Sequence, residues 1–142
     1  MSYLDDNYLF AFMSPSTGSV GSRNPRVTLK LVSTINNSIF IGMGHFNTIK
    51  NNRYKLAGKY NHGSYVCRCS DGFVLNNFDK EQNWRTSSFR GETGDIIQMS
   101  CDKERKVLTV KNLNKNLSQE MKFQEEEEKQ LHFCIRIYQI NT

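Results

Sequence analysis

Short apolar runs separated by turn-forming residues are the dominant pattern of this sequence. No segment repeats apolar residues at the i, i+3, i+4, i+7 spacing of an amphipathic helix, whereas runs with period-two alternation recur between clusters of Gly, Asn, Ser and Asp. The pattern predicts nine strands: Leu9–Met13, Arg26–Thr34, Ser38–Met43, Gly63–Ser70, Gly72–Asn76, Asp95–Asp102, Lys106–Lys111, Leu117–Phe123 and Leu131–Ile140. We therefore expect an all-β protein.

The pattern of apolar residues within the strands also predicts how the sheets pack. Nine short strands fit two antiparallel sheets better than one open sheet, because one face of each sheet must find apolar cover. Alternation assigns a core of inward-facing side chains: Ile41, Tyr65, Cys67, Ile97, Met99, Val110, Phe123, Phe133 and Ile135. Asp95 begins its strand and is expected to stay hydrated. The last strand is apolar on both faces, so we expect it to be central or to pack against a terminal segment.

The four cysteines are expected to be free thiols. Cys67 and Cys69 share one face of a strand, where neighbours lie about 7 Å apart, which is too far for a disulfide. Four irregularly spaced cysteines are also too few for the disulfide framework of a small secreted protein. Cys101 alternates with the apolar residues of its strand and is predicted to be core.

Length and composition narrow the class of protein. A chain of 142 residues suits one domain, and 11% aromatic residues exclude disordered and fibrous classes. The longest apolar runs fall well short of the ~20 residues that cross a bilayer. Asp5 and Asp6 stand where a signal peptide would carry basic residues. We expect an intracellular protein, cytoplasmic with a nuclear location left open.

Positive charge is concentrated in the first two-thirds of the chain. Residues 1–94 carry 11 basic and 6 acidic groups, whereas residues 95–142 carry 8 of each. The densest segment, Lys50–Lys59, has four cations and no acid. It is interpreted either as a solvated loop or as a docking surface for an acidic partner. Glu125–Glu128 is interpreted as an exposed connector, with an acidic docking site as the alternative.

No arrangement of residues in the sequence predicts catalysis. A nucleophilic Cys needs a base within about 3 Å, and His132 and Cys134 lie two apart on one strand, too distant for proton transfer. The carboxylates that could pair for acid–base work lie at turns or strand starts and imply no pair: Asp71, Asp79, Asp95 and Asp102. We therefore predict that the protein is not an enzyme.

Metal and phosphate sites are likewise not predicted. Structural zinc sites are built from knuckles of the CxxC type, whereas here the spacing is Cys67-x-Cys69, and Cys101, Cys134 and His62 are scattered over different strands. Gly42-Met43-Gly44 lacks both the second glycine pair and the Lys-Ser/Thr of a phosphate loop. We expect no bound cofactor and no metal.

Several segments resemble the SPRY domain, a bent β-sandwich. The most specific is Gly94-Asp95-Ile96-Ile97, followed by a charged turn, the strand Val107–Val110, an Asn-rich turn and a further strand. His62-Gly63-Ser64-Tyr65 is similar to the central "SYGY…DG" strand of the family, and Ser38–Gly44 is similar to the strand before it. Leu131–Tyr138 takes the place of the closing strand.

The resemblance spans roughly residues 26–140 and implies a function. It suggests a single SPRY-like domain over residues 26–142, with residues 1–25 forming an N-terminal segment that packs one strand on the sandwich. SPRY domains bind partners through surface loops that differ from member to member. The resemblance therefore implies a non-catalytic module that recognises a partner protein or peptide, within a larger multiprotein assembly or outside one.

The connections after Gly44, Gly58 and Asn76 are expected to lie together at one end of such a sandwich. They contain the predicted partner-binding residues His45, Lys50, Arg53, Tyr54, Lys59, Tyr60, His62, Phe78, Trp84 and Arg85. Aromatic residues and arginines are the types that most often dominate binding energy. Trp84, the single tryptophan, is interpreted as a binding anchor, with capping of the sandwich edge as the alternative.

Two other functions remain open at this point. Lys50–Lys59 contains Tyr54 and is followed by Tyr60, a combination of cations and stacking rings that is used to bind single-stranded nucleic acid. A phosphate-driven interaction of this kind would weaken steeply with added salt. A purely architectural subunit of a large assembly is the third class.

Overall fold

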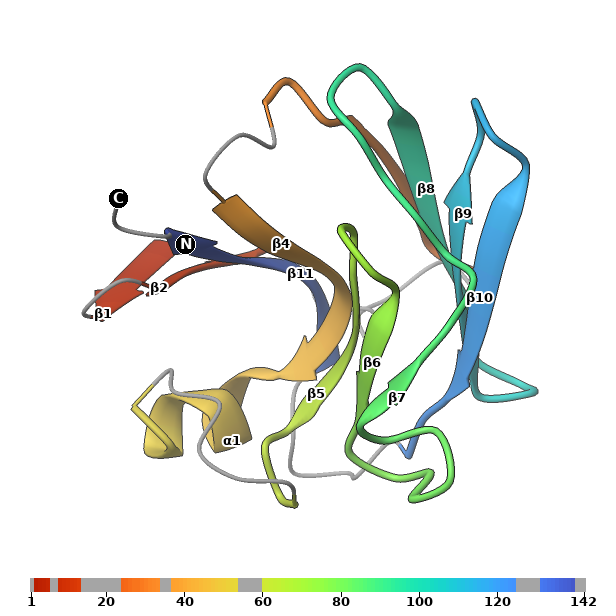
Figure 1. The fold of residues 1–142 in the computed structure, drawn as a ribbon. Coiled ribbons are helices and arrows are strands. Elements are labelled where there is room, and N and C mark those ends of the chain that lie inside the picture. Colours follow the sequence, from red (N-terminus) through yellow and green to blue (C-terminus); the bar gives the residue numbers. More distant parts are fainter. Residues whose placement is uncertain are drawn as a thin grey trace.

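Two antiparallel sheets form the molecule (Figure 1). The computed structural model describes residues 2–5, 8–13, 24–33, 37–53, 60–124 and 131–139. The larger sheet contains, in spatial order, β1 (Ser2–Asp5), β2 (Tyr8–Phe12), β11 (Leu131–Gln139), β4 (Asn37–His45), β5 (Ser64–Arg68), β6 (Phe73–Asn76) and β7 (Arg85–Thr86). The smaller sheet contains β10 (Leu117–Lys122), β9 (Val107–Asn112), β8 (Ile96–Asp102) and β3 (Arg26–Lys30).

The predicted fold class is confirmed, and each of the nine predicted strands is present with ends shifted by a few residues. Two strands and one helix were not predicted: β1, β7 and α1 (Phe46–Asn51). They are too short to show a periodic pattern of apolar residues: β7 is two exposed residues, and α1 is six residues that bury Ile49. Thr34, Ile140 and the Glu125–Glu128 segment lie outside the described residues.

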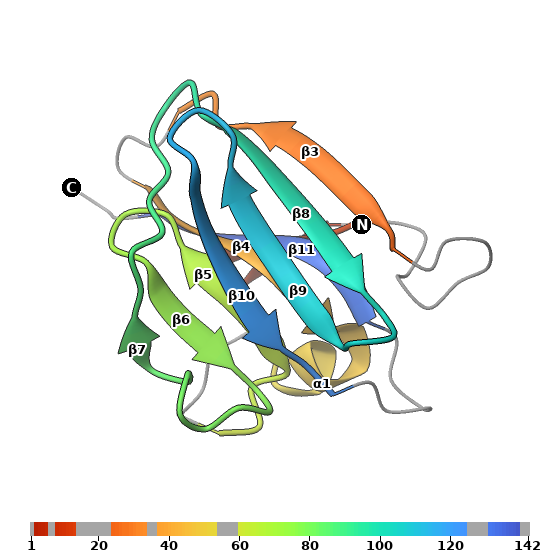
Figure 2. The same ribbon diagram turned by 90° about the vertical axis from the view of Figure 1, so that its right-hand side faces the viewer.

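The main core lies between the two sheets; in Figure 2 the smaller sheet lies in front of the larger one. Eight of the nine predicted core side chains are buried there, and Ile135 is half-buried and packs against them. Cys67, Cys69 and Cys101 belong to the same cluster, and all four cysteines are free, as predicted. Burial raises the pKa of Cys67, Cys69 and Cys134 to about 12, so these side chains remain protonated thiols at neutral pH.

A second, smaller core covers the outer face of the larger sheet. Its buried members come from five strands and from α1: Phe12, Phe40, Ile49, Val66, Leu75 and Cys134. α1 lies in the concave side of this curved sheet (Figure 1). The last strand, β11, pairs with β4 on one side and β2 on the other. It is apolar on both faces because Leu131 and Phe133 enter the main core, whereas Cys134 enters the second core. Its predicted central position is confirmed.

Asp95 is buried rather than hydrated, which corrects the expectation for this residue. It precedes β8 and is only 7% exposed. Its Oδ2 accepts hydrogen bonds from the Glu92 amide and the Asn112 side chain, at 2.9 and 2.8 Å, and pairs with Lys115 at 3.1 Å. Burial opposes ionisation, but these donors outweigh it and lower the pKa of Asp95. The residue therefore anchors the β9–β10 turn.

Gly42 marks the tightest approach between two central strands. A Cβ atom there would lie 1.9 Å from the Tyr65 carbonyl oxygen, which belongs to the paired strand β5. We expect Gly42→Ala to lower the free energy of unfolding by at least about 2 kcal/mol, because backbone must move to admit the methyl group. Urea denaturation followed by circular dichroism measures the change.

Gly94→Ala is the matched control for this prediction. Gly94 has a φ of +93° and no atom within 4 Å of the added Cβ, so only backbone strain of about 1 kcal/mol is expected. An equal loss of stability in the two variants would show that the approach of β4 to β5 is not limiting.

Candidate functional site

Three chain segments converge at one end of the sandwich, which we call the loop end. They are α1 with residues 52–53, residues 60–63 before β5, and the β6–β7 loop, residues 77–84 (Figure 1). The Asn52 side chain donates to the Asn61 carbonyl at 2.9 Å, and the Gly63 amide donates to Asn77 Oδ1 at 2.8 Å. The predicted meeting of these three connections is thus what the structure contains.

The side chain of Asn83 ties the last two segments together. Its Oδ1 accepts a hydrogen bond from the Asn76 amide at 3.0 Å and lies 3.1 Å from His62 Nε2. The Ser64 amide donates to His62 Nδ1 at 3.1 Å, so Nδ1 is unprotonated and Nε2 carries the proton donated to Asn83. His62 is therefore a neutral, buried strut.

Asn76 continues this network into the smaller sheet. Its Oδ1 accepts from the amides of Phe78 and Asp79, at 2.9 and 2.7 Å, which shapes the start of the β6–β7 loop. Its Nδ2 donates to Gln82 and to the carbonyl of Lys122 at the end of β10. The side chain of Asn76 thereby links the β6–β7 loop to the smaller sheet through partly buried hydrogen bonds.

The structure divides the predicted partner-binding residues into three groups. Six are exposed at or beside the loop end: Lys50, Arg53, Tyr60, Phe78, Trp84 and Arg85. His45 and His62 are each 1% exposed, so their side chains offer no surface to a partner and are not part of the exposed site. His45 Nε2 lies 3.0 Å from the Tyr65 hydroxyl, inside the sandwich. Tyr54 and Lys59 lie outside the described residues.

Trp84 has an unusual backbone for a large side chain. Its φ is +61°, in the left-handed region that bulky residues rarely occupy, and its side chain remains half-exposed. Its ring meets Phe73 edge to face at 6.1 Å, and its amide donates to the Val74 carbonyl. Arg53 and Asn61 at the loop end also have positive φ, at 55° and 58°. Such strained positions concentrate at functional sites.

An arginine–aromatic row runs inward from Trp84 across the larger sheet. The Arg68 guanidinium lies 5.1 Å from the Phe73 ring centroid and 5.4 Å from that of Phe40, and Arg136 lies 5.2 Å from Phe40. Arg68 also forms a two-point ion pair with Asp71, whose pKa it lowers. This row is invisible to pattern analysis, because it depends on the register of four strands.

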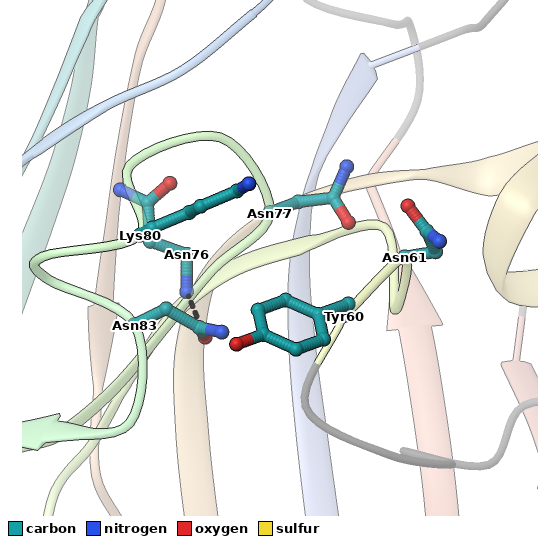
Figure 3. A pocket seen from close by; sticks show the side chains of 6 residues that line it. All are labelled: Tyr60, Asn61, Asn76, Asn77, Lys80 and Asn83. Atoms are coloured by element: carbon teal, nitrogen blue, oxygen red, sulfur yellow. Dashed lines mark hydrogen bonds between the residues drawn. The ribbon is translucent and has the colours of Figure 1, made fainter.

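A pocket of about 350 Å³ opens at the loop end (Figure 3). Its lining consists of Tyr60, Asn61, Asn76, Asn77, Lys80 and Asn83. Only Tyr60 among these was predicted from the sequence. The available signal was the Asn76-Asn77 pair at the end of a strand, where Asn favours turns and local hydrogen bonds.

Other kinds of site find little support in the described residues. Within these residues, no three His, Cys, Asp or Glu side chains are grouped so that they could hold a metal ion. Across the same part of the chain, no helix combines the length and apolarity that crossing a membrane requires. His132 Nδ1 lies 2.9 Å from the Met13 carbonyl and Cys134 is a protonated thiol, so neither is arranged as a nucleophile with its base.

Comparison with known proteins identifies the fold. No protein-family model matches the sequence, and no curated protein does. Among solved structures, the chain is similar to the SPRY domain of human HERC1, with a TM-score of 0.67 and 15% sequence identity over 99% of this chain and 80% of that one. The chain therefore has a SPRY-like fold, as its motifs indicated.

The His62 strut predicts a dependence of stability on pH. Burial lowers the pKa of His62 from its ordinary value, with Asn83 opposing this shift and Arg136 reinforcing it. The unfolded chain binds a proton near pH 6.5, whereas the folded protein resists protonation until a lower pH. The free energy of unfolding should be highest above pH 6.5 and fall below it, by at most about 1.4 kcal/mol per pH unit from this residue.

Urea titrations between pH 5 and 7.5 measure this effect. The free energy of unfolding should depend less on pH in His62→Gln, because the contribution of His62 is removed. His132 is a half-buried histidine on β11, and His132→Gln should keep the contribution of His62. If the stability of His62→Gln fell with pH as steeply as that of the wild type, the assignment of this pH dependence to His62 would be contradicted.

Proposed function

We propose that this protein is a non-catalytic recognition module that binds a partner protein or peptide at the loop end. The observation that carries the proposal is the convergence of three sequence-distant segments, two of which expose aromatic rings: Tyr60, Phe78 and Trp84 expose 58%, 49% and 48% of their surfaces. Half-exposed aromatic rings on a fixed framework bury large areas on binding at low entropic cost. The SPRY-like fold, which generally serves protein–protein interaction, supports this function.

The polar groups at the loop end favour binding over chemistry. His62 and His45 are both buried in hydrogen bonds within the sandwich. The half-buried His132, whose ring meets Phe46 of α1, has its Nδ1 2.9 Å from the Met13 carbonyl oxygen. A general base must instead reach the proton that it abstracts from a substrate. The SPRY-like fold is generally non-catalytic, which agrees with this use of the side chains.

Single-stranded nucleic acid is the alternative partner. Lys50, Arg53 and Arg85 supply exposed positive charge at or beside the loop end, but the β6–β7 loop also carries Asp79 and Glu81. A surface of mixed charge fits a protein partner better than a phosphate backbone, which selects a uniformly basic track. An architectural subunit would use a surface other than the loop end.

Trp84→Asn tests the proposal because Asn tolerates positive φ. The variant should fold with nearly unchanged stability and lose binding by on the order of 2 kcal/mol, since the indole is removed without straining the backbone. Leu113→Asn is the matched control: Leu113 is also half-exposed, but it lies in the β9–β10 turn at the opposite end of the molecule (Figure 2). Quantitative mass spectrometry of proteins retained from an extract, alongside thermal melting, gives both readouts.

The same experiment with nuclease treatment separates the alternatives. Protein recognition at the loop end is supported if Trp84→Asn loses its partners, while Leu113→Asn and the nuclease-treated wild type keep them. Loss of every partner after nuclease would favour nucleic acid. Retention by both Trp84→Asn and Arg53→Ala/Tyr54→Ala would place the interface elsewhere and contradict the proposal.

A further inference from the structure

Three of the asparagines that line the pocket at the loop end have their side-chain oxygens hydrogen-bonded to the framework. A backbone N–H can only donate, so the amide oxygens that face such groups must be the acceptors. Asn77 Oδ1 accepts from Gly63, Asn83 Oδ1 from Asn76, and Asn76 Oδ1 from two amides of its own loop. Because these oxygens already accept hydrogen bonds from the framework, the side-chain nitrogen of Asn77 is the group that can donate a hydrogen bond to a ligand in the pocket.

Lys80 adds the charge of the pocket. Its side chain extends along the pocket toward Asn77 (Figure 3), and within the described residues it has no ion pair. No acidic residue is among the six described side chains of the lining. The nearby Asp79 is turned to its own loop, where Oδ1 accepts from the amides of Glu81 and Gln82. The pocket is therefore locally positive, with one cation.

Tyr60 supplies the remaining wall. More than half of its surface is exposed, and its ring lies between Asn83 and Asn61 in the pocket (Figure 3). Asn61 has positive φ and no side-chain hydrogen bond within the described part of the chain, so its amide is able to turn toward a ligand. An aromatic wall beside amide donors accommodates the methylene stem of a side chain as well as its polar end.

We propose that this pocket binds the carboxylate of an aspartate or glutamate side chain within an extended segment of the partner. The inference rests on the proposed function and specifies its partner chemistry. A carboxylate accepts several hydrogen bonds and carries a single charge, which matches amide donors and one lysine. A phosphate monoester carries nearly two negative charges and would leave one of them without a matching cation. The volume admits one side chain with its adjoining main chain.

Selection from a random heptapeptide display library against the full chain tests the inference. The peptides are flanked by fixed residues, so a terminal carboxylate cannot stand in for a side chain. We expect enriched peptides to share an Asp or Glu at one position. Replacing it by Asn or Gln in an amidated synthetic peptide should weaken binding at least tenfold by isothermal titration calorimetry.

Two protein variants locate the effect in the pocket. Asn77→Asp keeps an oxygen for the Gly63 amide but replaces the donor by a negative charge, and Lys80→Gln removes the cation. Each should weaken the acidic peptide at least tenfold, while the Asn or Gln version of the peptide binds both variants about as well as it binds the wild type. Lys30→Gln, an exposed lysine on β3 of the other sheet, is the charge-matched control and should change neither affinity.

The outcomes distinguish this inference from the proposed function. Selected peptides that lack an acidic position, or that bind Lys80→Gln unchanged, overturn the carboxylate site. If their binding still requires Trp84, recognition at the loop end stands. A library that yields no binder overturns the inference, and recognition of a folded partner is then decided by the Trp84→Asn experiment alone.

Discussion

The amide of Asn83 makes the contact on which the whole loop end depends. Its oxygen accepts hydrogen bonds from the backbone amide of Asn76 on β6 and from His62 Nε2. His62 Nδ1 in turn accepts a hydrogen bond from the Ser64 amide at the start of β5. These groups are buried, so each lost partner would cost the full desolvation of an unpaired polar group. The network therefore holds residues 60–63 and the β6–β7 loop in one arrangement, and the pocket exists because of it.

The sheets and the loop end are therefore stabilised by different interactions. Apolar packing between the sheets, with a second cluster under α1, supplies the stability of the molecule. The loop end instead contains positive-φ positions and half-exposed rings, which the surrounding hydrogen bonds hold in place. Binding surfaces are often built in this way, with irregular loops on a rigid scaffold.

Much of the fold was predictable, whereas little of the site was. Period-two alternation located nine strands and a core that includes Tyr65 and Cys67, because burial of one sheet face imposes that period on the sequence. The same reasoning failed for Asp95, whose burial depends on Asn112 and Lys115 from another strand and its turn. It also failed for Asn77 and Lys80, since polar residues in a loop look alike whether they face solvent or a pocket.

The sequence by itself determined the class of structure and the identity of its core, because these follow from local alternation and turn chemistry. The resemblance of its motifs to the SPRY domain added the expectation that three connections meet at one end. Only the tertiary structure decided which polar residues of those connections face inward. His62 and Trp84 both come from connections predicted to carry function, yet one is a buried strut and the other is half-exposed. The reason is physical: the environment of each side chain is set by contacts with residues that are not its neighbours along the chain, Asn83 for His62 and Phe73 for Trp84.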